Sequence, residues 1–161
     1  MRKIFCLMLA GYLALASVAH AEVTVGQPTP ALVAQELDGK TFDLTTMKGK
    51  VVVLHFWATW CPSCKEEMPA LDAFAKSHPD AIVMVISADK SRQRDKVVDA
   101  MKMFSFQGAM LSDVSDNGFG TPSSIPVTYI IDKQGMVRNE MSPDQGVLTA
   151  QSLDAAVKSL R

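Results

Sequence analysis

Two cysteines, Cys61 and Cys64, stand three positions apart where an apolar run meets a helical pattern. The run over residues 51–57 reads VVVLHFW, and so continuous a β-branched stretch is typical of a strand buried on both faces. Pro62 suits the first position of a helix, because its missing N–H would have no partner there. The sequence therefore predicts a buried strand that turns directly into a helix at Cys61.

This placement predicts redox chemistry for the pair. The first turn of a helix presents unpaired N–H groups and the positive end of the helix dipole, which stabilise a thiolate at Cys61. Only the thiolate attacks a disulfide. Cys64 falls on the same helical face, near the separation that a disulfide requires. We therefore assign Cys61 as the attacking thiol and Cys64 as the resolving thiol.

The third cysteine, Cys6, lies in a segment with the pattern of an export leader. A basic start precedes an uncharged apolar stretch over residues 4–18, and the small residues of the sequence AHA then end at Ala21. We expect cleavage after Ala21, which makes residues 1–21 a signal peptide and residues 22–161 a single domain. An uncleaved N-terminal anchor is the alternative.

The mature chain would keep only Cys61 and Cys64. A disulfide between residues three apart closes a very small loop, so it constrains little of the unfolded chain and is poor structural stapling. In an oxidising compartment, a pair that contributes little to stability is expected to have a chemical role. A formal net charge of −1 and a pI near 6.3 predict neither nucleic acid nor an acidic membrane surface as partner. We expect the domain to act as a monomer.

The rest of the chain predicts an α/β fold around a central mixed β-sheet flanked by helices on both faces. Residues 107–124 contain three glycines and a proline and are interpreted as loop. The expected elements are a hairpin over 31–37 and 41–44, strands over 51–57, 81–87, 127–131 and 136–140, and helices over 62–76 and 91–104 and at the C-terminus around Leu153 to Leu160.

Metal binding is the alternative to redox chemistry for this cysteine pair. A zinc site would need further ligands, but no second cysteine pair exists, and His55 and His78 lack ligand-like spacing. Met101 and Met103 invite a copper(I) reading, although methionine more often fills gaps in a core. We expect no metal and no cofactor beyond the redox-active disulfide.

The segment FWATWCPSCKEEMP over residues 56–69 resembles the active-site segment of the TlpA/ResA/DsbE group of bacterial thioredoxin-like proteins. The likeness continues in the sequences GK at 39–40, KGKV at 48–51 and IPVTYIID at 125–132. It implies a thioredoxin-like fold with an N-terminal β-hairpin extension. It also implies a periplasmic reductase of protein disulfides, in several members serving cytochrome c maturation, which a membrane thiol donor re-reduces.

The resemblance also assigns a substrate surface. It implies that the Ile125–Pro126 peptide bond is cis and lies against the cysteines, where the backbone of Ile125 pairs with a substrate chain. Trp60 and Pro62 would form the rim of the same surface. An ordinary trans proline at the start of a strand is the alternative, since a cis X–Pro bond costs only about 0.5–1 kcal/mol but is uncommon in folded proteins.

Two further ionisable residues lie close to the cysteines in sequence. By resemblance, Glu67 is a catalytic acid whose charge opposes ionisation of Cys64 and which shuttles its proton. The alternative is a solvated helix charge, which is what we expect of Glu66 on another face. His55 replaces the aspartate or asparagine of related proteins. It either exchanges protons with Cys64 or is an inert, neutral side chain in the sheet.

A peroxiredoxin is the second candidate within redox chemistry. That class places a threonine further from its cysteine than Thr59 lies from Cys61, together with a supporting proline, and this sequence has neither. The Pro62–Ser63 dipeptide carries no charge that would stabilise the Cys61 thiolate strongly, so a strong oxidant is not expected either. The sequence therefore favours a thiol–disulfide oxidoreductase that reduces disulfides of protein partners.

Overall fold

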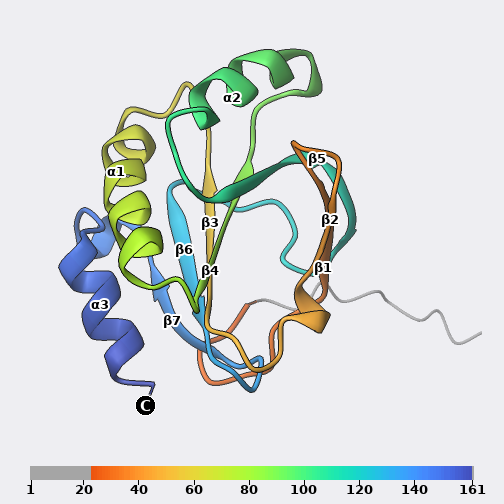
Figure 1. Ribbon diagram of the computed structural model, residues 1–161. Coiled ribbons are helices and arrows are strands. Elements are labelled where there is room, and N and C mark those ends of the chain that lie inside the picture. The colour runs from red at the N-terminus through yellow and green to blue at the C-terminus, as the bar shows by residue number, and fades with distance from the viewer. Residues whose placement is uncertain (1–22, 161) are drawn as a thin grey trace, which may run out of the picture.

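The computed structural model describes residues 23–160, so the predicted leader over 1–21 lies outside the described residues. A seven-stranded sheet in the order β2-β1-β5-β4-β3-β6-β7 forms the centre of the fold (Figure 1). Its strands are β1 (Leu32–Glu36), β2 (Thr41–Asp43), β3 (Val52–Trp57), β4 (Ile82–Ser87), β5 (Gln107–Asn117), β6 (Val127–Ile131) and β7 (Val137–Met141). The helices are α1 (Pro62–Ser77), α2 (Arg94–Met101) and α3 (Ala150–Lys158), with 3-10 turns η1 (Leu44–Thr46), η2 (Ser91–Gln93) and η3 (Pro143–Gln145).

Strand β3 is an interior strand of the sheet, parallel to β4 and antiparallel to β6. His55 at its centre is in register with Val85 of β4 and Thr128 of β6. Every residue of β3 is buried, which confirms the interpretation of its apolar run. The sheet is therefore mixed, as predicted, with its most protected strand leading directly to Cys61.

The three helices pack against one face of this sheet. Met68 of α1, Val97 of α2 and Leu153 of α3 belong to the same core cluster as Trp57. The crossovers β3-α1-β4 and β4-α2-β5 advance in the same direction across the sheet, and right-handed crossovers then place both helices on the same side. The expectation of helices on both faces is wrong in this respect.

The opposite face is covered by the N-terminal hairpin and by the segment before β6. Its core cluster contains Phe42 of β2, Leu44 of η1 and Phe56 of β3. The ring of Phe119 lies against this cluster, with its centroid 6.1 Å from that of Phe56 and 5.4 Å from that of Tyr129. The predicted hairpin extension is thus confirmed. It covers the face of the sheet against which no α-helix packs among residues 23–160.

Strand β5 is the main element that sequence reasoning missed. Its first residues pair in parallel with β4, and its later residues pair antiparallel with β1 through an irregular register. The strand is polar and only partly buried, so it lacks the apolar run that marked β3 and β4. Helix α2 is also shorter than predicted, since it begins at Arg94 after a 3-10 turn and ends at Met101.

Among residues 23–160, no helix has both the length and the apolar character of a membrane span.

Candidate active site

Cys61 and Cys64 form a disulfide at the start of α1, with 5.3 Å between their Cα atoms. Cys61 is the N-cap residue of the helix, and the backbone N–H of Cys64 donates to Cys61 Sγ at 3.2 Å. The Ser63 hydroxyl lies 3.5 Å from the same sulfur. Pro62 occupies the first helical position, as predicted. The geometry places Cys61 Sγ at the positive end of the helix dipole, where a thiolate is stabilised.

The surroundings of the two sulfurs differ. Cys64 is completely buried, while Cys61 keeps 5% of its surface exposed. The neighbouring Trp60 is 61% exposed, a large fraction for an apolar side chain, and Pro62 is exposed as well. An incoming disulfide would therefore meet Trp60, Pro62 and Cys61 before it met Cys64.

The Ile125–Pro126 bond is cis, as the resemblance implied. Strand β6 begins directly after it, and the pairing of Val127 with Phe56 places this peptide at the end of β3 that leads to the cysteines. Pro126 is buried, whereas Ile125 is half-buried and packs against the core cluster that contains both Cys61 and Cys64. The fold thus brings together two segments separated by about sixty residues in the sequence.

Glu67 lies one helical turn beyond Cys64 and is only 4% exposed. Burial raises the pKa of its carboxyl, the Leu148 N–H that donates to Oε1 at 3.1 Å partly opposes this rise in pKa, and the Glu66 charge adds to it. Glu67 is therefore not a solvated surface charge, whereas Glu66 is exposed, as expected. The contact with Leu148 joins α1 to the segment that precedes α3.

His55 is fully buried in β3, in the layer beneath α1. Its Nδ1 lies 2.8 Å from Thr128 Oγ1, while Nε2 has no hydrogen-bond partner among the described residues. Desolvation lowers the pKa of the imidazole to about 3, so the side chain is neutral at physiological pH. Of the two readings of His55, the neutral histidine within the sheet is the one that this environment favours.

The residues considered for metal binding do not gather. Met101 is buried in the core while Met103 is exposed, and His78 stacks on Phe74 near the far end of α1. Among residues 23–160, no group of three or more His, Cys, Asp or Glu side chains could hold a metal ion.

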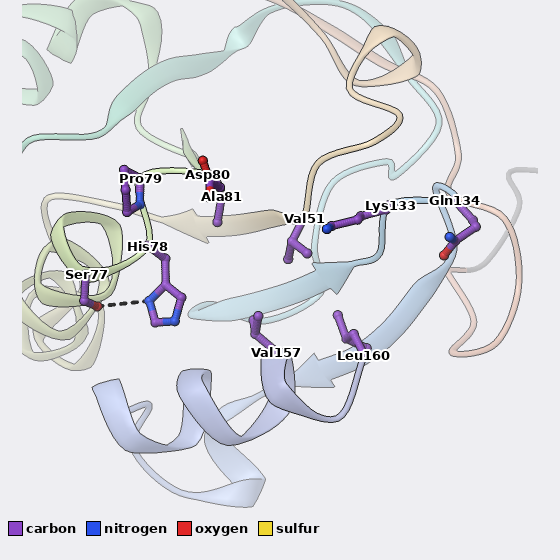
Figure 2. A pocket seen from close by; sticks show the side chains of 10 residues that line it. All are labelled: Val51, Ser77, His78, Pro79, Asp80, Ala81, Lys133, Gln134, Val157 and Leu160. Carbon is purple, nitrogen blue, oxygen red and sulfur yellow. Dashed lines mark hydrogen bonds between the residues drawn. The ribbon is translucent and has the colours of Figure 1, made fainter.

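A cavity of about 370 Å³ lies at the opposite end of α1 from the cysteines (Figure 2). Its walls include His78 after α1, Lys133 between β6 and β7, and Leu160 after α3. Since α1 has sixteen residues, at a rise of about 1.5 Å each its two ends are roughly 24 Å apart. This cavity is therefore separate from the cysteine site.

Sequence reasoning missed Asp89, which lies just beyond β4 and is 3% exposed. Its carboxylate accepts hydrogen bonds from the backbone N–H and the hydroxyl of Thr59, two residues before Cys61. An acidic residue two positions after a buried parallel strand was the available signal, but nothing in the sequence indicated a partner thirty residues earlier.

A thioredoxin-like fold with a cysteine pair at a helix N-terminus and a cis-proline at the start of the neighbouring strand is typical of thiol–disulfide oxidoreductases. Comparison with known proteins agrees, because residues 25–140 match the model of the AhpC/TSA family, and the chain belongs to that family. It is 29% identical over 126 residues to "Thiol-disulfide oxidoreductase ResA" of Bacillus cereus (77% of this chain, 73% of ResA). It is also 32% identical over 118 residues to "Thioredoxin-like protein YneN" of Bacillus subtilis (71% and 69%).

Among solved structures, the chain is similar to a secreted disulfide oxidoreductase of Mycobacterium tuberculosis that is homologous to E. coli DsbE. The TM-score is 0.64 at 21% identity, over 80% of this chain and 95% of the other. The predicted fold and the predicted relationship to the ResA and DsbE proteins are thus confirmed. The protein is a thiol–disulfide oxidoreductase.

Proposed function

We propose that the protein is an exported reductase of protein disulfides in which Cys61 attacks and Cys64 resolves. The observation that carries this proposal is the position of Cys61 as N-cap of α1, with the Cys64 N–H directed at its sulfur. A donor that already points at Cys61 Sγ in the disulfide is in place to stabilise the thiolate after reduction. The burial of Cys64 supports the assignment of the second role to that residue.

The reaction proceeds by two exchanges. The Cys61 thiolate attacks one sulfur of the substrate disulfide, which forms a mixed disulfide and releases one substrate thiolate that takes up a proton. Cys64 then loses its proton and attacks Cys61 Sγ, so that the Cys61–Cys64 bond forms and the second substrate thiol leaves. The enzyme gains the disulfide that the substrate loses, and a donor dithiol must reduce it before the next cycle.

The substrate surface comprises Trp60, Pro62, Ile125 and Pro126. Its support is the exposure of Trp60 and Pro62 beside Cys61, and the cis peptide at the start of β6, whose half-buried Ile125 packs on the cysteine cluster. An extended substrate segment would lie between the Trp60 side and the Ile125 backbone, with its disulfide over Cys61.

The leader pattern supports the cellular setting of this proposal. A signal peptide over 1–21 would deliver a domain of residues 22–161 to the periplasm, where disulfides form in protein substrates. The structurally similar disulfide oxidoreductase of Mycobacterium tuberculosis is a secreted protein. In the periplasm the donor would be a membrane thiol protein, and the resemblance to DsbE points to substrates in cytochrome c maturation.

Peroxide reduction is less well supported by the site. The Thr59 hydroxyl donates to Asp89 Oδ1 at 2.7 Å, so it is engaged away from Cys61. The sulfur of Cys61 instead contacts Ser63 and the backbone of Cys64. Turnover of a protein disulfide without consumption of hydrogen peroxide is the behaviour that this arrangement favours.

The Cys64→Ser variant tests the proposal, because it permits the first exchange and blocks the second. With a disulfide-bonded protein such as insulin, it should accumulate a covalent adduct that dithiothreitol releases. The Cys61→Ser variant is the matched control and should form none. Non-reducing electrophoresis and mass measurement of the adduct provide the readout. An adduct on Cys61→Ser alone, or wild-type turnover of peroxide and not of disulfide, would contradict the proposal.

Glu67→Gln should change the apparent pKa values of the two cysteine thiols with little effect on folding. Glutamine keeps an oxygen for the Leu148 N–H but removes the charge that opposes ionisation of Cys64. We expect the apparent pKa values of the coupled thiols to fall and the reductase rate at pH 7 to change about tenfold, somewhat less than a positioned proton carrier can contribute. Thiol absorbance and rate are measured against pH.

Glu66→Gln is the control, since it removes the same charge one position earlier, on an exposed face of α1. It should leave the thiol titration and the rate profile close to those of the wild type. Burial raises the pKa of Glu67 in the folded protein, so the folded state binds a proton more tightly at this residue than the unfolded state does. The stability that this difference contributes is lost as pH rises from the unfolded pKa through the folded one. Compared with the wild type, Glu67→Gln alone should lack this loss, so the gap between its unfolding midpoint and that of the wild type should shift in favour of Glu67→Gln as pH rises above 4.5. Equal behaviour of the two variants would reduce Glu67 to a packing residue.

A further inference from the structure

The end of β4 is hydrogen-bonded to the loop that leads into the active site. The Ala88 N–H donates to Trp57 O at 2.8 Å, at the last residue of β3. One residue further, Asp89 Oδ2 accepts from the Thr59 N–H at 2.8 Å, and Asp89 Oδ1 accepts from the Thr59 hydroxyl at 2.7 Å. Two adjacent residues after β4 therefore hold the last residue of β3 and one residue of the loop before Cys61.

The Asp89 carboxylate is itself held in place by Ser87. The Ser87 hydroxyl donates to Asp89 Oδ2 at 2.7 Å, and the Asp89 N–H donates to Ser87 Oγ at 3.1 Å. Ser87 is fully buried and Asp89 is 3% exposed. A carboxylate that accepts three hydrogen bonds in a buried site can occupy only one orientation without leaving a donor unpaired. Its position is therefore well defined.

The loop that it holds carries the reactive cysteine. The Cys61 N–H donates to Ala58 O at 3.1 Å, which closes a turn with Thr59 and Trp60 at its two central positions. Asp89 accepts hydrogen bonds from both the backbone N–H and the side-chain hydroxyl of Thr59, the first of these central residues. Rotation of this turn would carry Cys61 Sγ away from the Cys64 N–H, 3.2 Å distant, and would redirect the exposed Trp60.

We propose that Asp89 is a positioning residue for the exchange reaction, acting through Thr59. It holds the turn over residues 58–61 so that Cys61 Sγ stays at the N-terminus of α1 in the reduced enzyme. In the oxidised enzyme the Cys61–Cys64 bond also holds this sulfur, but reduction removes that bond. The hydrogen bonds of Asp89 to Thr59 then keep Cys61 Sγ aligned with the N-terminus of α1. The inference rests on the proposed role of Cys61 as attacking thiol.

Removing Asp89 would have two opposite effects on the Cys61 thiolate, and two variants separate them. Loss of a nearby negative charge favours the thiolate, whereas loss of alignment with the helix N-terminus disfavours it. Asp89→Asn removes the charge only, because the amide oxygen can accept from the Thr59 N–H and Ser87, while the amide NH₂ donates to the rotatable Thr59 hydroxyl. Asp89→Ala removes both the charge and the attachment.

The experiment compares the two variants by iodoacetamide labelling of reduced protein against pH and by steady-state insulin reduction. Relative to Asp89→Asn, Asp89→Ala should show a higher apparent pKa for Cys61 and about a tenfold lower kcat, with KM changed less than threefold. Asp89→Asn itself should stay within about threefold of the wild-type kcat. A residue with a merely structural role would lower the melting temperature without moving the thiol titration.

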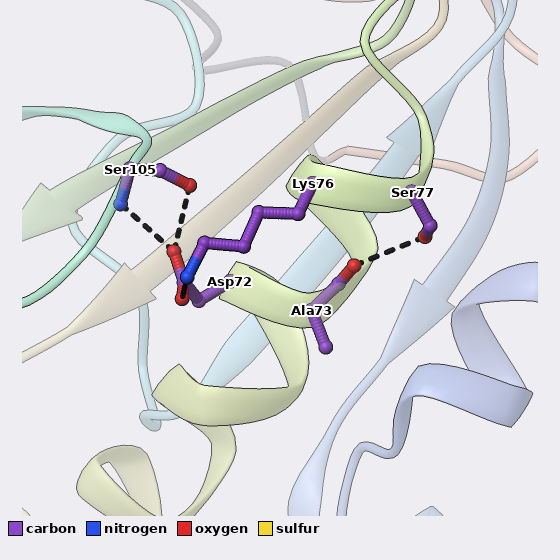
Figure 3. Close-up of polar contacts among 5 residues, drawn as sticks. All are labelled: Asp72, Ala73, Lys76, Ser77 and Ser105. Atoms are coloured by element: carbon purple, nitrogen blue, oxygen red, sulfur yellow. Dashed lines mark hydrogen bonds and ion pairs between the residues drawn. The ribbon is translucent and has the colours of Figure 1, made fainter.

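Asp72→Ala is the matched control. Asp72 Oδ1 accepts from the backbone N–H of Ser105 at 2.8 Å and from its hydroxyl at 2.7 Å, the same two kinds of donor that Asp89 binds in Thr59 (Figure 3). It lies eight residues beyond Cys64, roughly 12 Å along α1 at a rise of about 1.5 Å per residue. This variant should lose stability through the Ser105 contact and keep the wild-type thiol titration and kcat.

A second variant, Thr59→Val, keeps the test decisive if Asp89→Ala fails to fold. Valine matches the shape of threonine but cannot donate to Asp89 Oδ1, so it should lower kcat about threefold and raise the apparent pKa of Cys61. Identical titration and kcat for Asp89→Ala and Asp89→Asn, or an unchanged Thr59→Val, would overturn the proposal. Failure of the proposed function is distinguishable, because Cys61→Ser would then stay active whatever residue 89 is.

Discussion

Replacement of Cys61 with serine should lower disulfide reductase activity by more than about a thousandfold, since removal of a nucleophile typically costs on the order of 10³–10⁶ in rate. The reason is that Cys61 is the N-cap of α1 and, at 5% exposed, the less buried of the two cysteines. In the reduced wild type, alkylation should label Cys61 first, with an apparent pKa below the free cysteine value of about 8.5. Mass spectrometry of peptides labelled at each pH gives both numbers.

Cys64→Ser is the informative comparison for this result. It should retain a rapidly labelled Cys61 and one round of substrate attack, but it should turn over poorly because the mixed disulfide is not resolved. If both cysteines of the wild type were labelled equally at every pH, the assignment of distinct roles would be wrong. If Cys61→Ser retained multiple turnover, Cys64 would be the attacking thiol.

The free energy of unfolding should fall as pH drops below 6.5, because the buried His55 resists protonation. With a pKa of about 3 in the folded protein and 6.5 when unfolded, the unfolded state binds the extra proton in the interval between. The stability that His55 contributes is thus full above pH 6.5 and is lost as pH falls toward 3. At pH 5 the expected loss is about 2 kcal/mol, or roughly thirtyfold in the folding equilibrium.

Urea denaturation from pH 5 to 7.5 measures this slope. His55→Asn should remove most of it, whatever that variant does to stability at pH 7, because asparagine does not titrate. His78→Asn is the matched control, since the His78 side chain reaches solvent. It should keep the wild-type slope. A His55→Asn protein with an unchanged slope would show that His55 is accessible to protons in the folded state.

Much of the fold was predictable because its central elements have strong local patterns. The observed β3, β4 and β6 lie within one residue of the predicted bounds. Their bounds were predictable because strands buried on both faces have nearly unbroken apolar sequences. Helix α1 was equally clear from its proline at the start and its apolar spacing. The cysteine pair, the hairpin and the cis peptide followed from the same segments and their resemblance to a known family.

The missed features are those whose causes lie in distant parts of the chain. Strand β5 is polar, and it is a strand because β4 and β1 offer hydrogen bonds on its two sides, which its own sequence does not indicate. The Asp89 contact joins residues thirty positions apart through a carboxylate that is indistinguishable from a turn residue in the sequence. The burial of Glu67 likewise depends on Leu148, 81 positions later.

The strand order has a consequence for the sequence in which the molecule can be assembled. β3 pairs with β6 and β1 pairs with β5, so each of these ladders joins segments that lie some seventy residues or more apart in the chain. Distant pairings of this kind form late, after the cost of closing a large loop has been met. A chain that ends before Ile125 already contains both cysteines and all of α1, but it lacks the Ile125–Pro126 peptide and the strand beside Phe56. During synthesis the reactive thiols therefore emerge well before the surface that selects what they react with.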